Sequence, residues 1–127
     1  MKKYIVHSNQ APAAIGPYSQ AVRAGNFLYI SGQIALDPIT GNFMRGKIEE
    51  QTERILNSIA AILKNDGMSL SNIVKTNIYI IDITEFERMN VIYEKFFGKH
   101  KPARACVQVA ALPKGARIEI DTVAFSE

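Results

Sequence analysis

The sequence predicts an α/β fold of the α+β kind, in which two helices cover one face of a mixed six-stranded sheet. Residues 48–65 and 84–97 carry apolar side chains at the spacing of amphipathic helices. Several other segments alternate polar and apolar side chains with a period of two, which is typical of strands. The order strand, strand, strand, helix, strand, helix, strand, strand favours one sheet with both helices on the same face.

The composition suits one compact domain that spans residues 1–127. The chain is 47% hydrophobic, and its Gly and Pro residues occur singly at short turns, without a linker or an internal repeat. The net charge of +3 is spread along the chain, so it does not indicate a nucleic-acid partner.

Cysteine usage and the first residues bear on the compartment. Cys106 is the only cysteine, so no disulfide can form within the chain, and no spacing of Cys with His suggests a metal site. The N-terminal residues lack the apolar run of a signal peptide, and no segment approaches the roughly 20 apolar residues of a membrane span. We therefore expect a cytoplasmic protein with no membrane partner.

Turn residues divide the first third of the chain into strands. The Gly-Asn pair at residues 25–26 suits the positive φ angles of a tight turn, so segments 20–24 and 27–35 form a predicted hairpin. Asp-Pro and Gly-Asn pairs within residues 37–42 mark a second turn. We expect this turn to lead into a short strand before the first helix.

Each predicted helix has an apolar stripe and a recognisable end. The first helix, residues 48–65, ends before an Asp-Gly pair. The second begins at Thr84, where Glu87 completes a capping box, and it ends before Gly98. Its apolar stripe comprises Phe86, Met89, Tyr93, Phe96 and Phe97.

The remaining strands are predicted from β-branched and alternating residues. Residues 73–81 form a central strand, and residues 103–109 and 116–125 form a final hairpin. If residues 110–115 make the connection, Cys106 lies opposite Glu119. Arg104 is then diagonal to Glu119, at about 7 to 8 Å between backbones.

Arg104 and Glu119 are the candidate chemical groups of this hairpin, and two interpretations stay open. They can form a structural ion pair. Alternatively, Arg104 grips the carboxylate of a small acid with its planar fork of donors, and Glu119 orients a water molecule. Exclusion of bulk water would raise the pKa of Glu119 and suit it to proton transfer.

The second face of the sheet has an unusual set of residue types. Alternation in strand 27–35 separates Leu28, Ile30 and Ile34 from a set that contains Phe, Tyr, Ser and Gln. In strand 103–109 it separates Ala and Val from Arg104, Cys106 and Gln108. A face rich in Tyr, Phe, Cys, Gln and Ser but poor in Lys and Glu indicates a subunit interface. The alternative is the solvated sheet face of a monomer.

Four blocks of sequence resemble the hallmarks of the RidA (YjgF/UK114) family, in the family's order and over nearly the whole chain. They are residues 15–21 (IGPYSQA), 31–34 (SGQI), 102–107 (PARACV) and 112–121. The resemblance implies a chorismate-mutase-like fold and a homotrimer packed through the helix-free sheet face, with clefts between subunits. It also implies hydrolytic deamination of reactive 2-imino or enamino acids to 2-keto acids and ammonia, with no cofactor.

The resemblance also implies roles for individual residues. The substrates would be 2-iminobutanoate and 2-iminopropanoate, products released by pyridoxal-phosphate dehydratases. Arg104 would bind the substrate carboxylate beside a water held by Glu119, and Tyr18 would line the cleft and hydrogen-bond the water or the nitrogen. Ser31 and Gly32 would offer hydroxyl and backbone contacts.

Plainer interpretations of these residues remain open. Tyr18 can be an interface aromatic, and Gly32 a strand bulge or a close backbone approach. Asn90 lies off the apolar stripe of the second helix, so it either reaches a neighbouring cleft or faces solvent. Cys106 adjoins the proposed site, where a packed thiol is favoured over a nucleophile.

Two rival functions use the same features. One is a non-catalytic regulatory trimer that binds a small 2-imino or 2-keto acid. The other is an RNA-acting translation inhibitor, which the dispersed charge and the helical placement of the aromatic residues disfavour. Release of ammonia from a fresh imine separates the enzyme from the binder.

Overall fold

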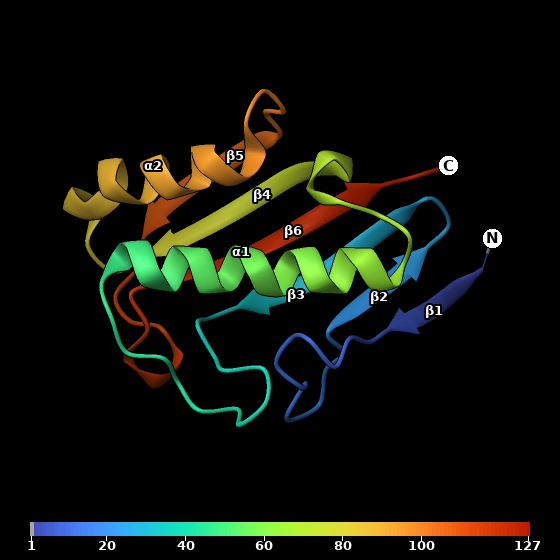
Figure 1. Cartoon of the computed structure of the whole chain (residues 1–127), viewed down its shortest axis with the longest axis horizontal. Helices are drawn as coiled ribbons and strands as arrows, with labels where there is room; N and C mark the ends of the chain where they lie inside the picture. Colours follow the sequence, from blue (N-terminus) through green and yellow to red (C-terminus); the bar gives the residue numbers. More distant parts are fainter. Residues whose placement is uncertain (1) are drawn as a thin grey trace.

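The chain folds into two layers, a six-stranded sheet and a pair of helices (Figure 1). This computed structural model describes residues 2–127. The elements are β1 (Lys3–Val6), β2 (Ala21–Ala24), β3 (Phe27–Gln33), α1 (Ile48–Asn65), β4 (Ile73–Ile80), α2 (Phe86–Phe97), β5 (Ala103–Gln108) and β6 (Ile118–Phe125). The predicted fold class, a mixed sheet with two helices, is confirmed.

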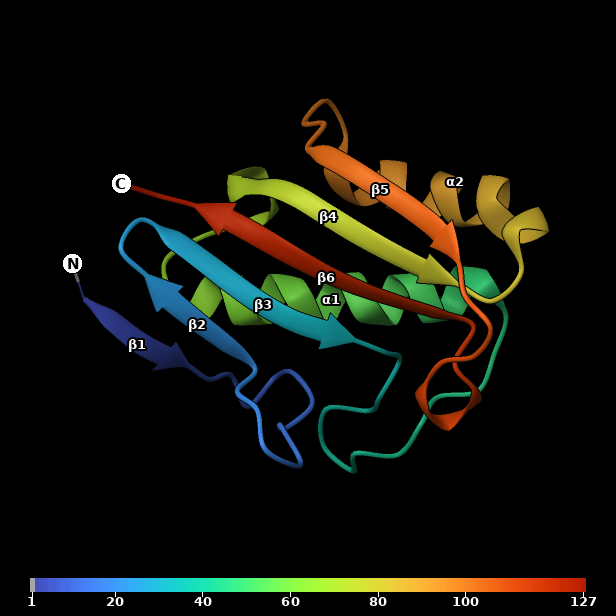
Figure 2. The same ribbon diagram turned by 180° about the vertical axis from the view of Figure 1, so that it is seen from behind.

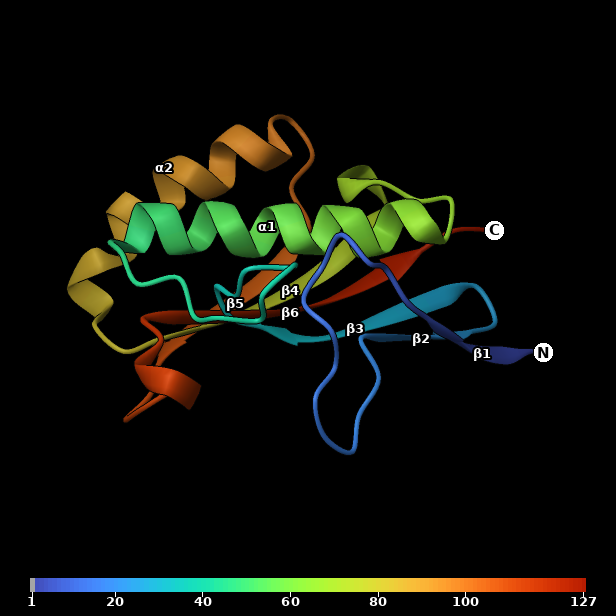
Figure 3. The same ribbon diagram turned by 60° about the horizontal axis from the view of Figure 1, so that its bottom comes forward.

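The sheet has the strand order β1-β2-β3-β6-β4-β5. All neighbouring pairs are antiparallel except β4 and β5, which are parallel. Both helices lie on the same side of the sheet (Figure 3). The opposite side, seen from behind in Figure 2, has no helix in front of it. The sheet therefore has a helix face and an open face.

The helix α1 has the predicted bounds, and its apolar stripe forms the centre of the core. Ile55, Leu56, Ile59, Ile62 and Leu63 have no exposed surface. They pack with inward-facing strand residues such as Leu28, Ile78, Ile80, Ile118 and Ile120. Full burial of such a side chain stabilises the fold by about 1.5 to 3 kcal/mol. Within the described residues, no helix is both long and apolar enough to cross a membrane.

The predicted start of α2 is wrong. The Asp82 carboxylate accepts the backbone N–H of Thr84 at 3.0 Å and its hydroxyl at 2.6 Å. This cap begins a short 3-10 helix, Ile83–Glu85, and α2 follows from Phe86. The Thr84 hydroxyl is therefore a donor to Asp82 rather than the cap of a box with Glu87. The predicted apolar stripe is correct, because Met89, Tyr93 and Phe97 are buried.

Six strands are present, but one of them was assigned to the wrong segment. The short strand predicted after residue 42 is a single bridge between Leu36 and Phe43. The sixth strand is β1, which pairs only with β2 at the sheet edge. Three of its four residues are exposed, so it lacks the alternation that identifies a half-buried strand.

The predicted final hairpin is also wrong, because β4 lies between β5 and β6. The chain runs from β4 through α2 into β5, and such a helical crossover places β5 parallel to β4. The strand β6 then pairs with the other edge of β4. Glu119 therefore lies opposite Tyr79, and Arg104 lies opposite Thr76.

Two irregularities alter the predicted faces. A register shift between Ile30 and Gln33 of β3 turns Gln33 into the interior, where it is 6% exposed, instead of onto the open face. A second shift between Ile73 and Lys75 buries Ile73 and exposes Val74, although Thr76, Ile78 and Ile80 further along β4 face inward. In β6 the alternation is regular, with Ile118, Ile120 and Ala124 inside.

Candidate functional site

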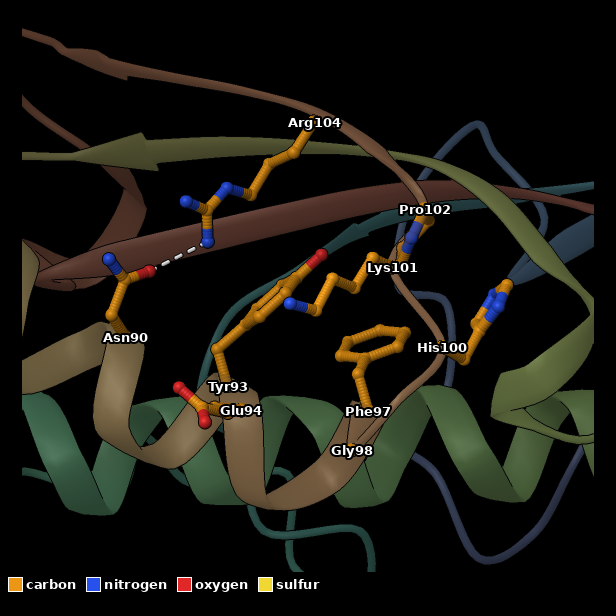
Figure 4. Close-up of a pocket in the computed structure, with 9 residues that line it drawn as sticks. All are labelled: Asn90, Tyr93, Glu94, Phe97, Gly98, His100, Lys101, Pro102 and Arg104. Carbon is orange, nitrogen blue, oxygen red and sulfur yellow. Dashed lines mark hydrogen bonds between the residues drawn. The ribbon is translucent and has the colours of Figure 1, made fainter.

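Arg104 lies on the edge strand β5, with its side chain against α2. Its guanidinium carbon is 5.3 Å from the centroid of the Phe86 ring and 4.9 Å from that of Tyr93. Its Nη1 donates to Oδ1 of Asn90 at 2.7 Å, the contact drawn as a dashed line in Figure 4. Asn90 therefore faces Arg104 rather than solvent alone.

Arg104 lacks an acid partner, a feature that it shares with Arg45 and Arg54 among the described residues. Arg23, Arg88 and Arg117 each lie within 2.8 Å of a carboxylate oxygen. No carboxylate among residues 2–127 pairs with Arg104, so the ion pair with Glu119 is not formed within the chain. The guanidinium keeps an unpaired positive charge, which is the state that binds an anionic ligand.

A pocket of about 300 Å³ adjoins Arg104, between α2 and the start of β5. Its lining residues are Asn90, Tyr93, Glu94, Phe97, Gly98, His100, Lys101, Pro102 and Arg104 (Figure 4). Aromatic rings form one wall, and Lys101 adds a second cation beside the single acid Glu94. Such a cavity has the size and polarity to hold a small organic acid.

Glu119 belongs to the open face of β6. Burial raises the pKa of the Glu119 carboxyl, and the negative charge of Asp121 raises it further. Asp121 is held in place by Nδ2 of Asn77 at 2.8 Å and the hydroxyl of Tyr79 at 2.9 Å. Its hydrogen bond with Asp121 also raises the pKa of Tyr79. Glu119 is thus prepared to accept a proton more readily than an ordinary glutamate.

Gly32 provides the space that Glu119 occupies. A Cβ atom at Gly32 would lie 2.2 Å from Oε2 of Glu119. Gly32 also lies within the irregular part of β3, so both the bulge and the close approach considered from the sequence are present. The close approach here involves a side chain rather than another backbone. The two residues form one group on the open face.

Ser31 lies within β3, and Tyr18 lies in the loop that precedes β2. The Ser31 hydroxyl donates to the carbonyl of Ser19 at 2.6 Å, and the Ser31 N–H donates to the carbonyl of Gln20 at 2.9 Å. These bonds connect β3 with the loop that carries Tyr18. Tyr18 is 52% exposed, so its hydroxyl is free to meet a ligand or another protein surface.

The predicted site residues therefore fall into two groups. Arg104 and Cys106 belong to the helix face, since Thr76 and Ile78, their neighbours on β4, are buried beneath the helices, and Asn90 contacts Arg104 from α2. Glu119 belongs to the open face with its neighbour Tyr79. The predicted placement of Arg104 and Cys106 on the same face as Glu119 is wrong, because it depended on the hairpin that does not form.

Cys106 is partly buried and packs against the core. Burial raises the pKa of its thiol, although the nearby Arg104 opposes this shift. A raised pKa keeps the thiol protonated at neutral pH and makes it a poor nucleophile. This favours the packed-thiol interpretation.

Several residues of the two groups were not identified as site residues from the sequence. Phe86 and Tyr93 were assigned only to the apolar stripe of α2, and Tyr79 only to a central strand. The available signal was Arg104 itself, because a guanidinium group often lies over an aromatic ring and the preceding helix carries several aromatic side chains. Within residues 2–127, no cluster of three or more His, Cys, Asp or Glu side chains is arranged to hold a metal ion.

Fold and site together define a class: a two-layer α+β protein with an unpaired arginine beside a small-molecule pocket at its sheet edge. The model of the Endoribonuclease L-PSP family matches residues 8–126. The chain belongs to this family, which includes the RidA and YjgF proteins.

Individual relatives span nearly the whole chain. The human 2-iminobutanoate/2-iminopropanoate deaminase is 47% identical, over 95% of this chain and 88% of its own. The crystal structure of YyfA from Yersinia pestis, of the conserved Rid protein family, has a TM-score of 0.95 at 43% identity, covering 98% of this chain and 100% of its own. TdcF of E. coli, solved with bound serine, has a TM-score of 0.92 at 37% identity, covering 98% and 99% respectively.

Proposed function

We propose that this chain hydrolyses small 2-imino acids, including 2-iminobutanoate and 2-iminopropanoate, to 2-keto acids and ammonia. The observation that carries this proposal is the unpaired guanidinium of Arg104 beside the pocket. A substrate carboxylate would supply the missing partner. The name of the human relative and the serine bound to the E. coli relative both agree with a small substrate that carries a carboxylate.

Arg104 binds the substrate carboxylate in this proposal. Asn90 occupies Nη1, and the Nε and Nη2 edge of the guanidinium remains available for two parallel hydrogen bonds. Cys106 lies two residues along β5 from Arg104 and lines a separate hollow with Thr84 and Phe86 rather than the pocket beside Arg104. These contacts fix the acid end of the substrate and leave its C=N carbon pointing away from β5.

Glu119 handles the water. Its carboxylate takes a proton as water adds to the C=N carbon and passes this proton to the nitrogen, which gives a carbinolamine. It then takes the proton of the new hydroxyl group and passes it to the nitrogen as the C–N bond breaks, so that ammonia leaves and the keto acid remains. The raised pKa of Glu119 supports both steps. Tyr18 hydrogen-bonds the water or the nitrogen, while Ser31 and Gly32 provide hydroxyl and backbone contacts.

The site is completed by a second copy of the chain, because Arg104 and Glu119 belong to opposite faces of one sheet. We propose a homotrimer in which the open face of each copy meets its neighbours. Tyr29, Phe27 and Val107 support this, since 40 to 50% of each of these large side chains is exposed. Glu119 of one copy then faces Arg104 of the next.

Two substitutions test the proposed roles. Arg104→Lys replaces the planar fork by a point charge, so we expect KM to rise about tenfold or more, equivalent to roughly 1.5 to 3 kcal/mol. Glu119→Gln removes the proton carrier, so we expect kcat to fall about a hundredfold or more while binding of 2-oxobutanoate persists. A coupled dehydratase assay measures turnover, and calorimetry measures binding.

The same assay separates an enzyme from a binder. Purified protein must release ammonia and keto acid from freshly generated imine faster than buffer does. Tight binding of 2-oxobutanoate without turnover would contradict the enzymatic proposal and favour a regulatory trimer. Normal turnover in both variants would contradict the assigned roles.

A further inference from the structure

We propose that Phe86 and Tyr93 are positioning residues that hold the guanidinium of Arg104 in the orientation that binds a carboxylate. This inference rests on the proposed carboxylate-binding role of Arg104. It assigns to two aromatic residues of α2 a part in substrate recognition that goes beyond packing. The evidence is a continuous aromatic column with the guanidinium inside it.

The column begins on one face of α2. Phe86, Tyr93 and Phe97 are seven and four residues apart, a spacing that aligns side chains along one side of a helix. Tyr93 and Phe97 are stacked, with ring centroids 4.4 Å apart and an angle of 30° between the ring planes. Arg104 adds to this column through its contacts of 4.9 Å with Tyr93 and 5.3 Å with Phe86.

Tyr93 is itself anchored beneath Arg104. Its hydroxyl and that of Thr76 are 2.9 Å apart in a buried hydrogen bond. Thr76 is also the β4 residue directly beside Arg104 in the parallel pair. The ring that contacts the guanidinium is therefore fixed to the strand that neighbours the arginine backbone. Figure 4 shows Tyr93 between α2 and Arg104.

This arrangement leaves one part of the guanidinium available. The two rings contact the guanidinium without hydrogen bonds, and Nη1 of the guanidinium donates a hydrogen bond to Asn90. The remaining donor edge is held in one orientation, although Arg104 belongs to an edge strand whose residues are largely exposed. An arginine fixed in this way loses less conformational freedom when a carboxylate binds, which increases affinity.

A purely structural role for the two rings predicts a different result from a positioning role. If the rings only stabilise the fold, their removal weakens the binding of every ligand to a similar degree. If the rings position the guanidinium, their removal weakens the binding of a charged ligand more than the binding of a neutral one. The experiment therefore compares 2-oxobutanoate with its neutral analogue 2-oxobutanamide, which has nearly the same shape but lacks the carboxylate.

The test variants are Tyr93→Leu and Phe86→Leu, with Tyr93→Phe and Phe86→Tyr as conservative partners. We expect each leucine variant to weaken binding of 2-oxobutanoate about tenfold, because a cation–π contact is lost, while binding of the amide changes less than about twofold. The conservative variants keep the ring and should retain most of the affinity. Phe96→Leu, on the same helix but without contact to Arg104, is the matched control.

The outcomes separate this inference from the proposed function. If Arg104→Lys leaves binding of 2-oxobutanoate unchanged, the proposed role of Arg104 is wrong. If Arg104→Lys weakens it but the leucine variants affect acid and amide equally, the positioning role is wrong. Phe86 is only partly buried, so Phe86→Leu decides the question even if Tyr93→Leu fails to fold.

Discussion

Glu119 illustrates how single side chains prepare the proposed chemistry. Three features act on it: burial, the negative charge of Asp121, and the space left by Gly32. The first two disfavour its ionised form, and the third allows the carboxylate to lie against the backbone of β3. None of these is a local property of the segment around residue 119, because Gly32 comes from a distant part of the sequence.

Asp121→Asn should shift the pH dependence of turnover. The Asp121 charge raises the pKa of Glu119, so its removal must lower that pKa. If ionised Glu119 accepts the proton from water, the fraction in the active form at low pH increases. The acid limb of the profile of kcat against pH should therefore move to lower pH.

Tyr79→Phe is the matched control, because it removes a hydrogen bond from Asp121 but leaves its charge in place. We expect its acid limb to stay near that of the unaltered protein. An acid limb that moves to higher pH in Asp121→Asn would contradict the role of Glu119 as a base.

At the scale of elements, two ion pairs that connect different elements are buried to very different degrees. The Arg23–Asp66 pair connects β2 with the end of α1, and its side chains are only 13% and 10% exposed. Arg23 also donates to the carbonyl groups of Gly25 and Ser126, each at 2.8 Å. The Arg88–Glu49 pair connects the two helices but is 48% and 37% exposed.

Arg23→Met should lower the free energy of unfolding by about 2 to 4 kcal/mol, because it removes the only cation that the described part of the chain places beside the largely buried Asp66 carboxylate, which keeps just the Tyr4 hydroxyl, and a donor from two carbonyl groups. Arg88→Met removes an exposed pair and should cost about 1 kcal/mol or less. Urea denaturation followed by circular dichroism measures both. Equal losses of stability would show that burial does not decide how much these ion pairs stabilise the fold. Turnover by the folded protein should be unchanged in both variants.

At the scale of the whole molecule, the proposed site needs more than one copy of the chain, because Arg104 and Glu119 belong to different faces of one sheet. Arg104→Ala and Glu119→Ala should each be inactive alone. Mixed trimers formed by joint refolding at equal amounts should recover about one quarter of normal activity, because a site needs an intact arginine from one copy and an intact glutamate from its neighbour. The rate of ammonia release measures this recovery, and the molecular mass of the refolded protein verifies that trimers are present.

A mixture of Arg104→Ala with the double variant Arg104→Ala/Glu119→Ala is the control and must stay inactive. Sites built within one copy would give no recovery in either mixture, since every copy then carries a defect. That result, with mixed trimers present, would contradict the shared site.

The sequence by itself determined the fold class, the bounds of α1 and the apolar stripe of α2. These features depend on local periodicity, which 3.6-residue and two-residue repeats reveal directly. The hallmark blocks also identified the family and the candidate residues Arg104 and Glu119.

Only the tertiary structure decided which strands are neighbours and therefore which side chains meet. Adjacent segments in the sequence suggested a hairpin, but the crossover through α2 placed β4 between β5 and β6. Strand pairing depends on contacts between distant segments, and local patterns do not specify these contacts. For the same reason the aromatic column around Arg104 and the contact between Gly32 and Glu119 emerged only in three dimensions.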